Sequence, residues 1–358
     1  MLFDMRRHGN TISGWVAPDN PGLVSKVRIV RPDGSTAELA TNRARPDVVE
    51  HGLHHNGQVG FAIDASLFPD LASILDTLEV REFYSGVLLY RGYRDNVHIP
   101  MKVFRFDLQA MPYAHIEAIW DRNFALYYNG VERYNFDTLF GILNNPAATS
   151  VALAGRLNLS RYEHFFRERD YKLVTLLRHP LEELAERLLF VRYALAPQSA
   201  STFEGHLTGL KCLEPVAREI NLDTLNGLPE LFRNLTDEQK AVLENPMLRT
   251  IACEPDERPR RHHIELALSK LSSFDLVGVR SQYARFVTML DAILERPLFA
   301  GTTPADISLL GPLARALGTI KPVRALLALD IQLYELAERA VQDAIGLGVP
   351  HRHEQTAN

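Results

Sequence analysis

Three arginines stand where a cation could hold an anion, because each follows a short apolar stretch rich in β-forming residues. They are Arg156, Arg178 and Arg280, which follow residues 150–154, 173–177 and 274–279. Such stretches are typical of buried strands. Parallel strands place their carboxyl ends at one edge of a sheet, where ligands usually bind. The three arginines therefore predict an anion pocket at that edge.

Arg178 is the best placed of the three, within the sequence YKLVTLLRHPLEELAERLLFVRY at residues 171–193. Pro180 suits the first turn of a helix, and apolar residues at helical spacing follow it. A cation between a strand and a helix N-terminus suits an anion, since the backbone N–H groups there also favour negative charge. The alternative is that Arg178 pairs with a carboxylate of this protein.

The elements that must position these arginines begin after a β region. We expect strands at residues 25–30, 57–63 and 86–90, with a turn at residues 32–34, PDG. Residues 1–94 are therefore predicted to form a β-sandwich.

Strands and helices alternate after residue 95. Residues 97–109 can supply one extended segment and residues 115–128 a helix. Asp137 is expected to cap a short helix that ends at residue 143, and Ser160 the helix that follows the strand at residues 150–154. Short strands separated by helices predict a parallel α/β sheet.

The chain beyond residue 196 is expected to be mostly helical, apart from the strand at residues 274–279. The expected helices are residues 204–213, 236–244, 262–271, 283–294, 304–317 and 322–344. The prediction is thus an α/β fold: an N-terminal β-sandwich, then a parallel sheet at residues 95–346 with a largely helical C-terminal half. Residues 347–358 are predicted to be a polar tail.

The composition narrows the class of protein. The 358 residues are 46% hydrophobic and 23% charged, which is typical of a soluble globular protein. The net charge of −5 gives no general attraction to nucleic acid, and no apolar run is long enough for a membrane span. Two cysteines and no visible signal peptide favour the cytoplasm. His51, His54 and His55 lack partners at ligand spacing, so no metal site is expected.

Glycines, one tryptophan and turn residues of the β region carry a first resemblance. Residues 13–20 (SGWVAPDN), 45–48 (RPDV) and 57–63 (GQVGFAI) are similar to a small β-sandwich module attached to bacterial glycosyltransferases and other polysaccharide-assembly proteins. This resemblance implies an accessory or surface-binding role, with a glycosyltransferase as the expected partner. Trp15 and Phe61 are also explained as core of a sandwich.

The order of elements after residue 150 resembles the sulfotransferase family, particularly the bacterial carbohydrate sulfotransferases. The segments that carry the resemblance are residues 150–165, 172–184, 274–286 and 333–341. It implies a P-loop-like, sulfotransferase-type sheet and the donor 3′-phosphoadenosine 5′-phosphosulfate. Arg178 would then bind the 3′-phosphate of this donor, and Arg156 and Arg280 would hold the other donor phosphates.

The sequence departs from the family at the donor site. Glu186 stands near the place of a serine, and Glu183 replaces a basic residue. A carboxylate in a phosphate pocket is repulsive. The donor loop of the family is matched only in part, by residues 97–102 (VHIPMK). This segment has no glycine that would let backbone N–H groups approach the phosphosulfate.

Sulfuryl transfer to a saccharide hydroxyl in cell-surface glycan biosynthesis is the enzyme hypothesis. It requires a cation against the bridging oxygen, for which we expect Lys102 with Arg105 as its neighbour. His98 or His179 would be the base, because neutral imidazole suits hydroxyl deprotonation near neutral pH. A hydrogen-bonded turn residue is the favoured alternative for each histidine.

Two other functions stay open. The protein could be a noncatalytic relative that binds glycan or a glycosyltransferase partner, which Glu183, Glu186 and the missing glycine favour. It could also be another transferase that uses a phosphate or a nucleotide sugar, which would explain the basic turns without the sulfuryl donor.

Overall fold

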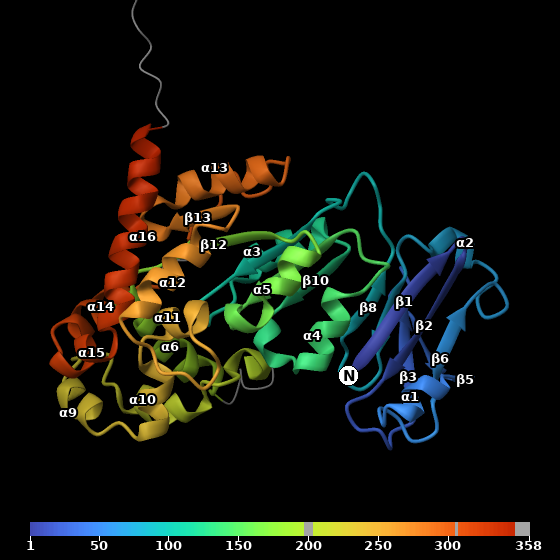
Figure 1. Ribbon diagram of the computed structural model, residues 1–358, viewed down its shortest axis with the longest axis horizontal. Coiled ribbons are helices and arrows are strands. Elements are labelled where there is room, and N and C mark those ends of the chain that lie inside the picture. The colour runs from blue at the N-terminus through green and yellow to red at the C-terminus, as the bar shows by residue number, and fades with distance from the viewer. Residues whose placement is uncertain (197–202, 305–306, 348–358) are drawn as a thin grey trace, which may run out of the picture. The chain divides into compact units, whose positions relative to one another are not determined.

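The computed structural model describes residues 1–196, 203–304 and 307–347 and divides into two compact units (Figure 1). The first unit contains Met1–Phe104, Ala114–Ala154 and His164–Lys172. The second unit contains Arg105–Tyr113, Gly155–Glu163 and the rest of the chain from Leu173. Each unit is a set of residues that pack together, which is not the same as a domain that folds by itself. The predicted domain boundary between residues 94 and 95 therefore stays a prediction.

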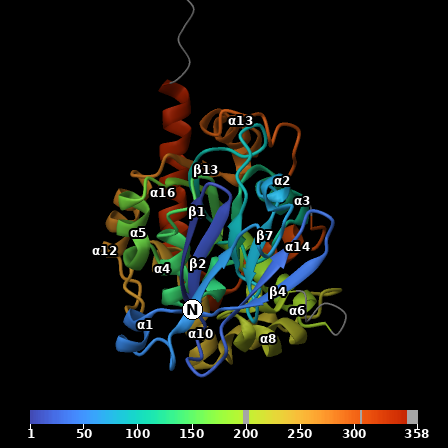
Figure 2. The ribbon, with the colours of Figure 1, turned by 90° about the vertical axis from the view of Figure 1, so that its right-hand side faces the viewer.

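Two antiparallel sheets of four strands begin the first unit, and Figure 2 looks onto them. The first has the order β1 (Leu2–His8), β2 (Thr11–Ala17), β6 (Gln58–Ile63), β5 (Arg43–Ala44). The second has the order β4 (Thr36–Ala40), β3 (Lys26–Val30), β7 (Glu79–Glu82), β8 (Leu88–Arg91). Three of the expected strands are thus present within two residues of their predicted bounds, as β3, β6 and β8.

Alternating burial holds these sheets together. Val27 and Ile29 of β3 are fully buried, whereas Arg28 between them is partly exposed. Met5 of β1 and Ile12 of β2 are also fully buried, and the neighbours of each in its own strand are at least partly exposed. One buried apolar face on each sheet is the pattern of a sandwich. Gly14 is required at its place, since a Cβ there would lie 2.4 Å from the carbonyl oxygen of Asp4 on β1.

Short helices also belong to the first unit. They are α1 (Pro46–Glu50), α2 (Leu71–Ile74), α3 (Ala114–Asn123), the 3-10 helix η1 (Val131–Arg133) and α4 (Phe136–Leu143). The helix expected at residues 115–128 is wrong after Asn123, because α3 ends there and Leu126–Asn129 form strand β10. Asn135, and not Asp137, caps α4 by accepting from the backbone N–H of Thr138.

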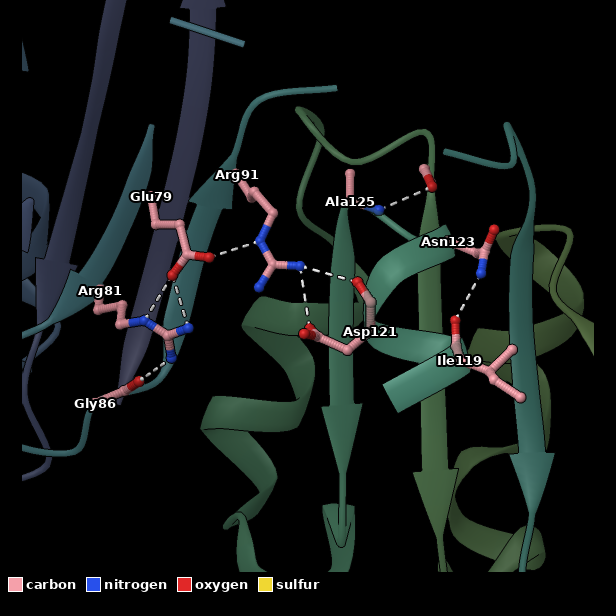
Figure 3. Close-up of polar contacts among 9 residues, drawn as sticks. Glu79, Arg81, Gly86, Arg91, Ile119, Asp121, Asn123 and Ala125 are labelled. Carbon is pink, nitrogen blue, oxygen red and sulfur yellow. Dashed lines mark hydrogen bonds and ion pairs between the residues drawn. The ribbon is translucent and has the colours of Figure 1, made fainter. Parts of the chain in front are cut away.

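A row of charged side chains links β7, β8 and α3 within the first unit (Figure 3). Glu79 accepts from Arg81 at 2.7 Å and from Arg91 at 2.8 Å, and Arg91 also donates to Asp121 at 3.1 Å. Asp121 is half exposed, so the row ends at the surface. We refer to these four residues as the sandwich row.

The parallel sheet has the strand order β10, β11 (Val151–Gly155), β9 (Lys102–Phe106), β12 (Lys172–Leu177), β13 (Leu276–Val279). β10 pairs with β11 in parallel, and β12 pairs with β13 in parallel. Every residue of β11 is buried, which explains its continuous apolar sequence. The predicted fold class is confirmed: antiparallel sheets, then a parallel sheet, then a largely helical C-terminal half.

The helices of the remaining chain begin with α5 (Leu159–Glu168) and α6 (Pro180–Ala194). They continue as α8 (Glu214–Glu219), α9 (Leu228–Arg233), α10 (Asp237–Leu243), α11 (Pro246–Ala252), α12 (His262–Leu271), α13 (Tyr283–Ile293), α14 (Leu310–Gly318), α15 (Lys321–Leu326) and α16 (Ala328–Leu347). The 3-10 helices in the described ranges of this part of the chain are η2 (Glu204–Leu207), η3 (Lys211–Leu213) and η4 (Arg280–Gln282). Among the described residues, no helix combines the length and apolar character needed to cross a membrane.

Several of the expected helix bounds are wrong. Residues 204–213 form η2 and η3 rather than one helix, α14 begins six residues later than expected, and the helix of residues 322–344 is divided into α15 and α16 at Leu327. Asn158, and not Ser160, caps α5, because its side chain accepts from the N–H of Arg161. Short polar residues near a helix start are interchangeable in sequence patterns, and only the local backbone decides which one caps.

Candidate functional site

Strand β12 and helix α6 position Arg178 at the place that the sequence predicts. β12 ends at Leu177, and α6 begins at Pro180 after His179, whose ring Nδ1 accepts from the N–H of Leu181 at 3.3 Å. Glu183, Glu186 and Arg187 lie three and four positions apart on α6 and therefore share one face of the helix. All three are buried.

Arg178 is engaged by groups of the protein itself. Its guanidinium donates to the carboxylate of Glu186 and, at 3.1 Å, to the hydroxyl of Tyr113. The Tyr113 hydroxyl in turn donates to Glu186 at 2.6 Å, and the N–H of Met111 donates to the other carboxylate oxygen at 3.4 Å. Arg178 is 4% exposed and Glu186 0% exposed. Both partners of this ion pair are thus shielded from solvent.

The charges around Arg178 determine the protonation states of Arg178 and Tyr113. Burial alone would lower the pKa of Arg178, but the carboxylates of Glu186 and Glu183 raise it well above its ordinary value. Burial and the Glu186 carboxylate raise the pKa of Tyr113 to about 12. At neutral pH the guanidinium is charged and the phenol keeps its proton, so Tyr113 acts as a donor.

A second part of the cluster surrounds a very small cavity. Glu183, Arg187 and Asp330 line a space of about 10 Å³ together with apolar residues. Glu183 Oε1 lies 3.9 Å from Arg187 Nη2 and accepts no hydrogen bond from the part of the chain that the structure describes. Burial, then the nearby Glu186 carboxylate, raise the pKa of Glu183. A cavity of this size holds at most one water molecule, so it offers no room for a nucleotide.

Asp330 and Asn245 cap each other's helices. The carboxylate of Asp330 on α16 accepts from the N–H groups of Met247 and Leu248 at the start of α11, both at 2.8 Å. The Asn245 side-chain oxygen accepts from Leu329 at 2.9 Å and Asp330 at 3.1 Å at the start of α16. Burial raises the pKa of Asp330 to about 7, in spite of these N–H donors.

The other predicted anion-binding arginines occupy different settings. Arg156 follows β11 and donates to the carbonyl oxygens of Gln109 at 3.4 Å and His206 at 3.2 Å. It also lies close enough to Glu183 to stabilise that carboxylate. Arg105 is buried and pairs with Asp107 at 2.7 Å. Arg280 is partly exposed in η4, at the end of β13. The structure thus brings Arg156 and Arg178 to one buried cluster.

The predicted catalytic residues are involved in local contacts. Lys102 is the first residue of β9; its Nζ lies 5.9 Å from the Tyr171 ring centroid, and burial together with Arg169 lowers its pKa. His98 is buried, and its Nδ1 accepts from the N–H of Arg94 at 3.1 Å. His179 likewise accepts a backbone hydrogen bond, from Leu181. In both predicted bases, His98 and His179, one ring nitrogen is thus an acceptor for the backbone.

One group of potential metal ligands lies outside the cluster. Single ligand atoms of Glu257, His262 and His263 lie within 4.8 Å of one another. However, His263 Nδ1 accepts from the N–H of Arg260 at 2.9 Å, so in the neutral ring Nε2 carries the proton and donates to Glu257 at 3.1 Å. A metal-bound histidine normally donates from its second nitrogen. The geometry is that of a hydrogen-bonded helix start.

A much larger cleft lies between α8, α9 and α10 and has a volume of about 690 Å³. Exposed carboxylates and amides line it, and buried apolar side chains form its inner wall. The polar lining includes Glu219, Asn226, Glu230, Asn234 and Thr236, and the apolar lining includes Val216, Ile220, Leu228 and Leu235. No lysine or arginine is among the described residues that line it.

Sequence reasoning missed several members of the buried cluster and the whole cleft. Tyr113 lies in a loop without a recognisable motif, and Asp330 is one of several acids of helix α16. The available signal was that Leu333, Tyr334 and Ala337 follow Asp330 at helical spacing, since an acid on an apolar helix face requires a buried partner. No protein-family model and no curated protein matches this chain.

Proposed function

We propose that this protein binds a saccharide and does not transfer a sulfuryl group. The observation that carries the proposal is the commitment of Arg178, which is only 4% exposed, to Glu186 and Tyr113. A donor phosphate would have to displace a carboxylate from a buried arginine, which costs several kcal/mol per desolvated charge. The Glu186 carboxylate therefore takes the place that a phosphate would need.

The cleft of α8, α9 and α10 supports saccharide binding. Carboxylate and amide groups such as those of Glu230 and Asn234 accept and donate the hydrogen bonds that sugar hydroxyls offer. The apolar wall, with Leu228 and Leu235, suits the C–H face of a sugar ring. Since its described lining contains carboxylates and no cation, the cleft favours neutral or amine-bearing saccharides over sulfated ones.

In this proposal the protein acts in the cytoplasm during glycan assembly, beside a glycosyltransferase. Cys212 and Cys253 are free, which supports a reducing compartment. Burial raises the pKa of Cys253 to about 11, so this thiol stays protonated and is not offered as a nucleophile.

Sulfuryl transfer is the second candidate, favoured by Arg156 and Arg178 lying at the ends of two strands of one parallel sheet. Calorimetric titration with 3′-phosphoadenosine 5′-phosphate separates the two functions. We expect no heat of binding at millimolar ligand with protein shown to be folded by circular dichroism. Micromolar binding would overturn our proposal and support a donor site.

Titration with a panel of neutral, amino and sulfated oligosaccharides tests the cleft. We expect a neutral or amino saccharide to bind, and Glu230→Gln together with Asn234→Ala to weaken it at least tenfold. Glu238→Gln is the matched control, because this residue is an exposed acid of α10 that does not line the cleft. Equal losses in the control, or preferential binding of sulfated sugars, would contradict the assignment.

A further inference from the structure

An apolar pocket separate from the saccharide cleft lies between β13, α12, α13 and α16. Its volume is about 330 Å³, at the small end of the range of ligand pockets. Sixteen of the described residues line it, and among these only Ser272, Gln282 and Arg285 have polar side chains. A pocket with an apolar lining and a few polar groups is the usual form of a small-molecule site.

The pocket has a closed base and an open mouth. Leu276, Val279 and Phe286 at its base are buried, whereas Met289 and Ala340 at its mouth are exposed. Gly278 is needed for this shape, because a Cβ there would lie 2.3 Å from a ring carbon of Phe286. Met289 is 46% exposed, and a flexible thioether at a mouth can adapt to a bound chain.

Arg285 gives the pocket its charge. Among the described residues that line the pocket it is the one charged residue, and it is exposed. Within the described parts of the chain, no hydrogen bond or ion pair engages its guanidinium. This is the opposite of Arg178, whose guanidinium is occupied by Glu186. A ligand with an apolar body and one anionic end would complement both features.

We propose that this pocket binds a free single-chain carboxylate, with the alkyl chain in the apolar base and the carboxylate on Arg285. The single cation supports one anionic group, and the small volume supports one chain rather than the two of a membrane phospholipid. The inference rests on the pocket alone and holds whether or not a saccharide occupies the cleft.

Titration of the full-length protein with dodecanoate below its micelle concentration tests this inference. We expect saturable binding, and a loss of about tenfold in affinity for Arg285→Gln, the effect of one charge-assisted pair. Arg339→Gln is the matched control, since Arg339 is an exposed arginine of α16 adjacent to Ala340 but does not line the pocket. Ala340→Trp, which fills the mouth from an exposed position, should abolish binding without unfolding the protein.

Three outcomes would overturn the proposal. The first is no binding of dodecanoate, decanoate or octanoate to the folded protein. The second is equal affinity for dodecyltrimethylammonium, which carries the same chain with a cationic head. The third is binding to vesicles of anionic phospholipid without binding of the free carboxylate, which would identify the pocket as part of a membrane contact.

Discussion

Two regions of this protein join arginines to carboxylates in a row, and they differ in burial. The pair of Arg178 and Glu186 has side chains 3% and 0% exposed, whereas Arg91 and Asp121 of the sandwich row are 15% and 52% exposed. A buried ion pair stabilises the fold only while both partners remain, and the loss of one leaves a desolvated charge. An exposed pair contributes little, because water and salt replace the partner. The same residue types therefore have different consequences in the two regions.

The largest expected effect comes from removing one partner of the buried pair. Glu186→Ala leaves the Arg178 guanidinium buried without its carboxylate and should lower the free energy of unfolding by about 3–5 kcal/mol. Urea unfolding followed by circular dichroism measures this change. Glu182→Ala is the control on the same helix, since Glu182 is only partly buried. Similar losses in the two variants would show that the cluster does not differ from an ordinary helix surface.

Removal of the mutual caps should have the next largest effect. Asp330→Ala leaves two buried N–H groups of α11 without an acceptor, and we expect a loss of about 2 kcal/mol in the free energy of unfolding. Asp330→Asn keeps one acceptor oxygen and should lose less. If alanine and asparagine were equivalent, capping would not explain the role of this residue.

The free energy of unfolding should depend on pH with opposite signs at Asp330 and at Glu79 of the sandwich row. Burial raises the pKa of Asp330 to about 7, so the folded state keeps a proton that the unfolded chain releases. Its contribution is therefore fully present below about pH 4 and is lost towards about pH 7, by about 1 kcal/mol per pH unit. Burial would raise the pKa of Glu79, but Arg91 and Arg81 outweigh it and lower that pKa. The Glu79 contribution is therefore lost as the pH falls below its ordinary range.

Urea unfolding across this pH range, with Asp330→Asn and Glu79→Gln, separates the two contributions. Each variant should remove the slope of its own group and leave the other slope unchanged. A native slope near neutral pH that survives in Asp330→Asn would refute the assignment to this carboxyl.

The smallest effect is expected at the exposed end of the sandwich row. Asp121→Asn should lower the free energy of unfolding by less than about 1 kcal/mol, because the carboxylate is half exposed. Molar salt should reduce the difference further by screening the pair. A loss as large as that of Glu186→Ala would remove the contrast between the two regions.

The fold was predictable where the sequence pattern is unambiguous. The apolar runs of β11 and β12 identify buried parallel strands, and Pro180 marks the start of α6. β10 was missed because Trp120 and Phe124 continue a helical spacing into the strand that follows. The position of Arg178 at the end of a strand was also predictable. Its partner Tyr113 was not, because the two residues are 65 positions apart and only the folded chain brings them together.

The mutual caps of Asn245 and Asp330 have a consequence for how this region opens. Neither helix start can lose its cap alone, because the residue that caps one start is part of the other. The backbone amides of Met247, Leu248, Leu329 and Asp330 should therefore show one common opening free energy in hydrogen–deuterium exchange. During synthesis the two helix starts cannot be completed until more than eighty further residues have followed Asn245. Late segments of the chain thus complete the ends of early ones, which favours folding of this region as a single cooperative step.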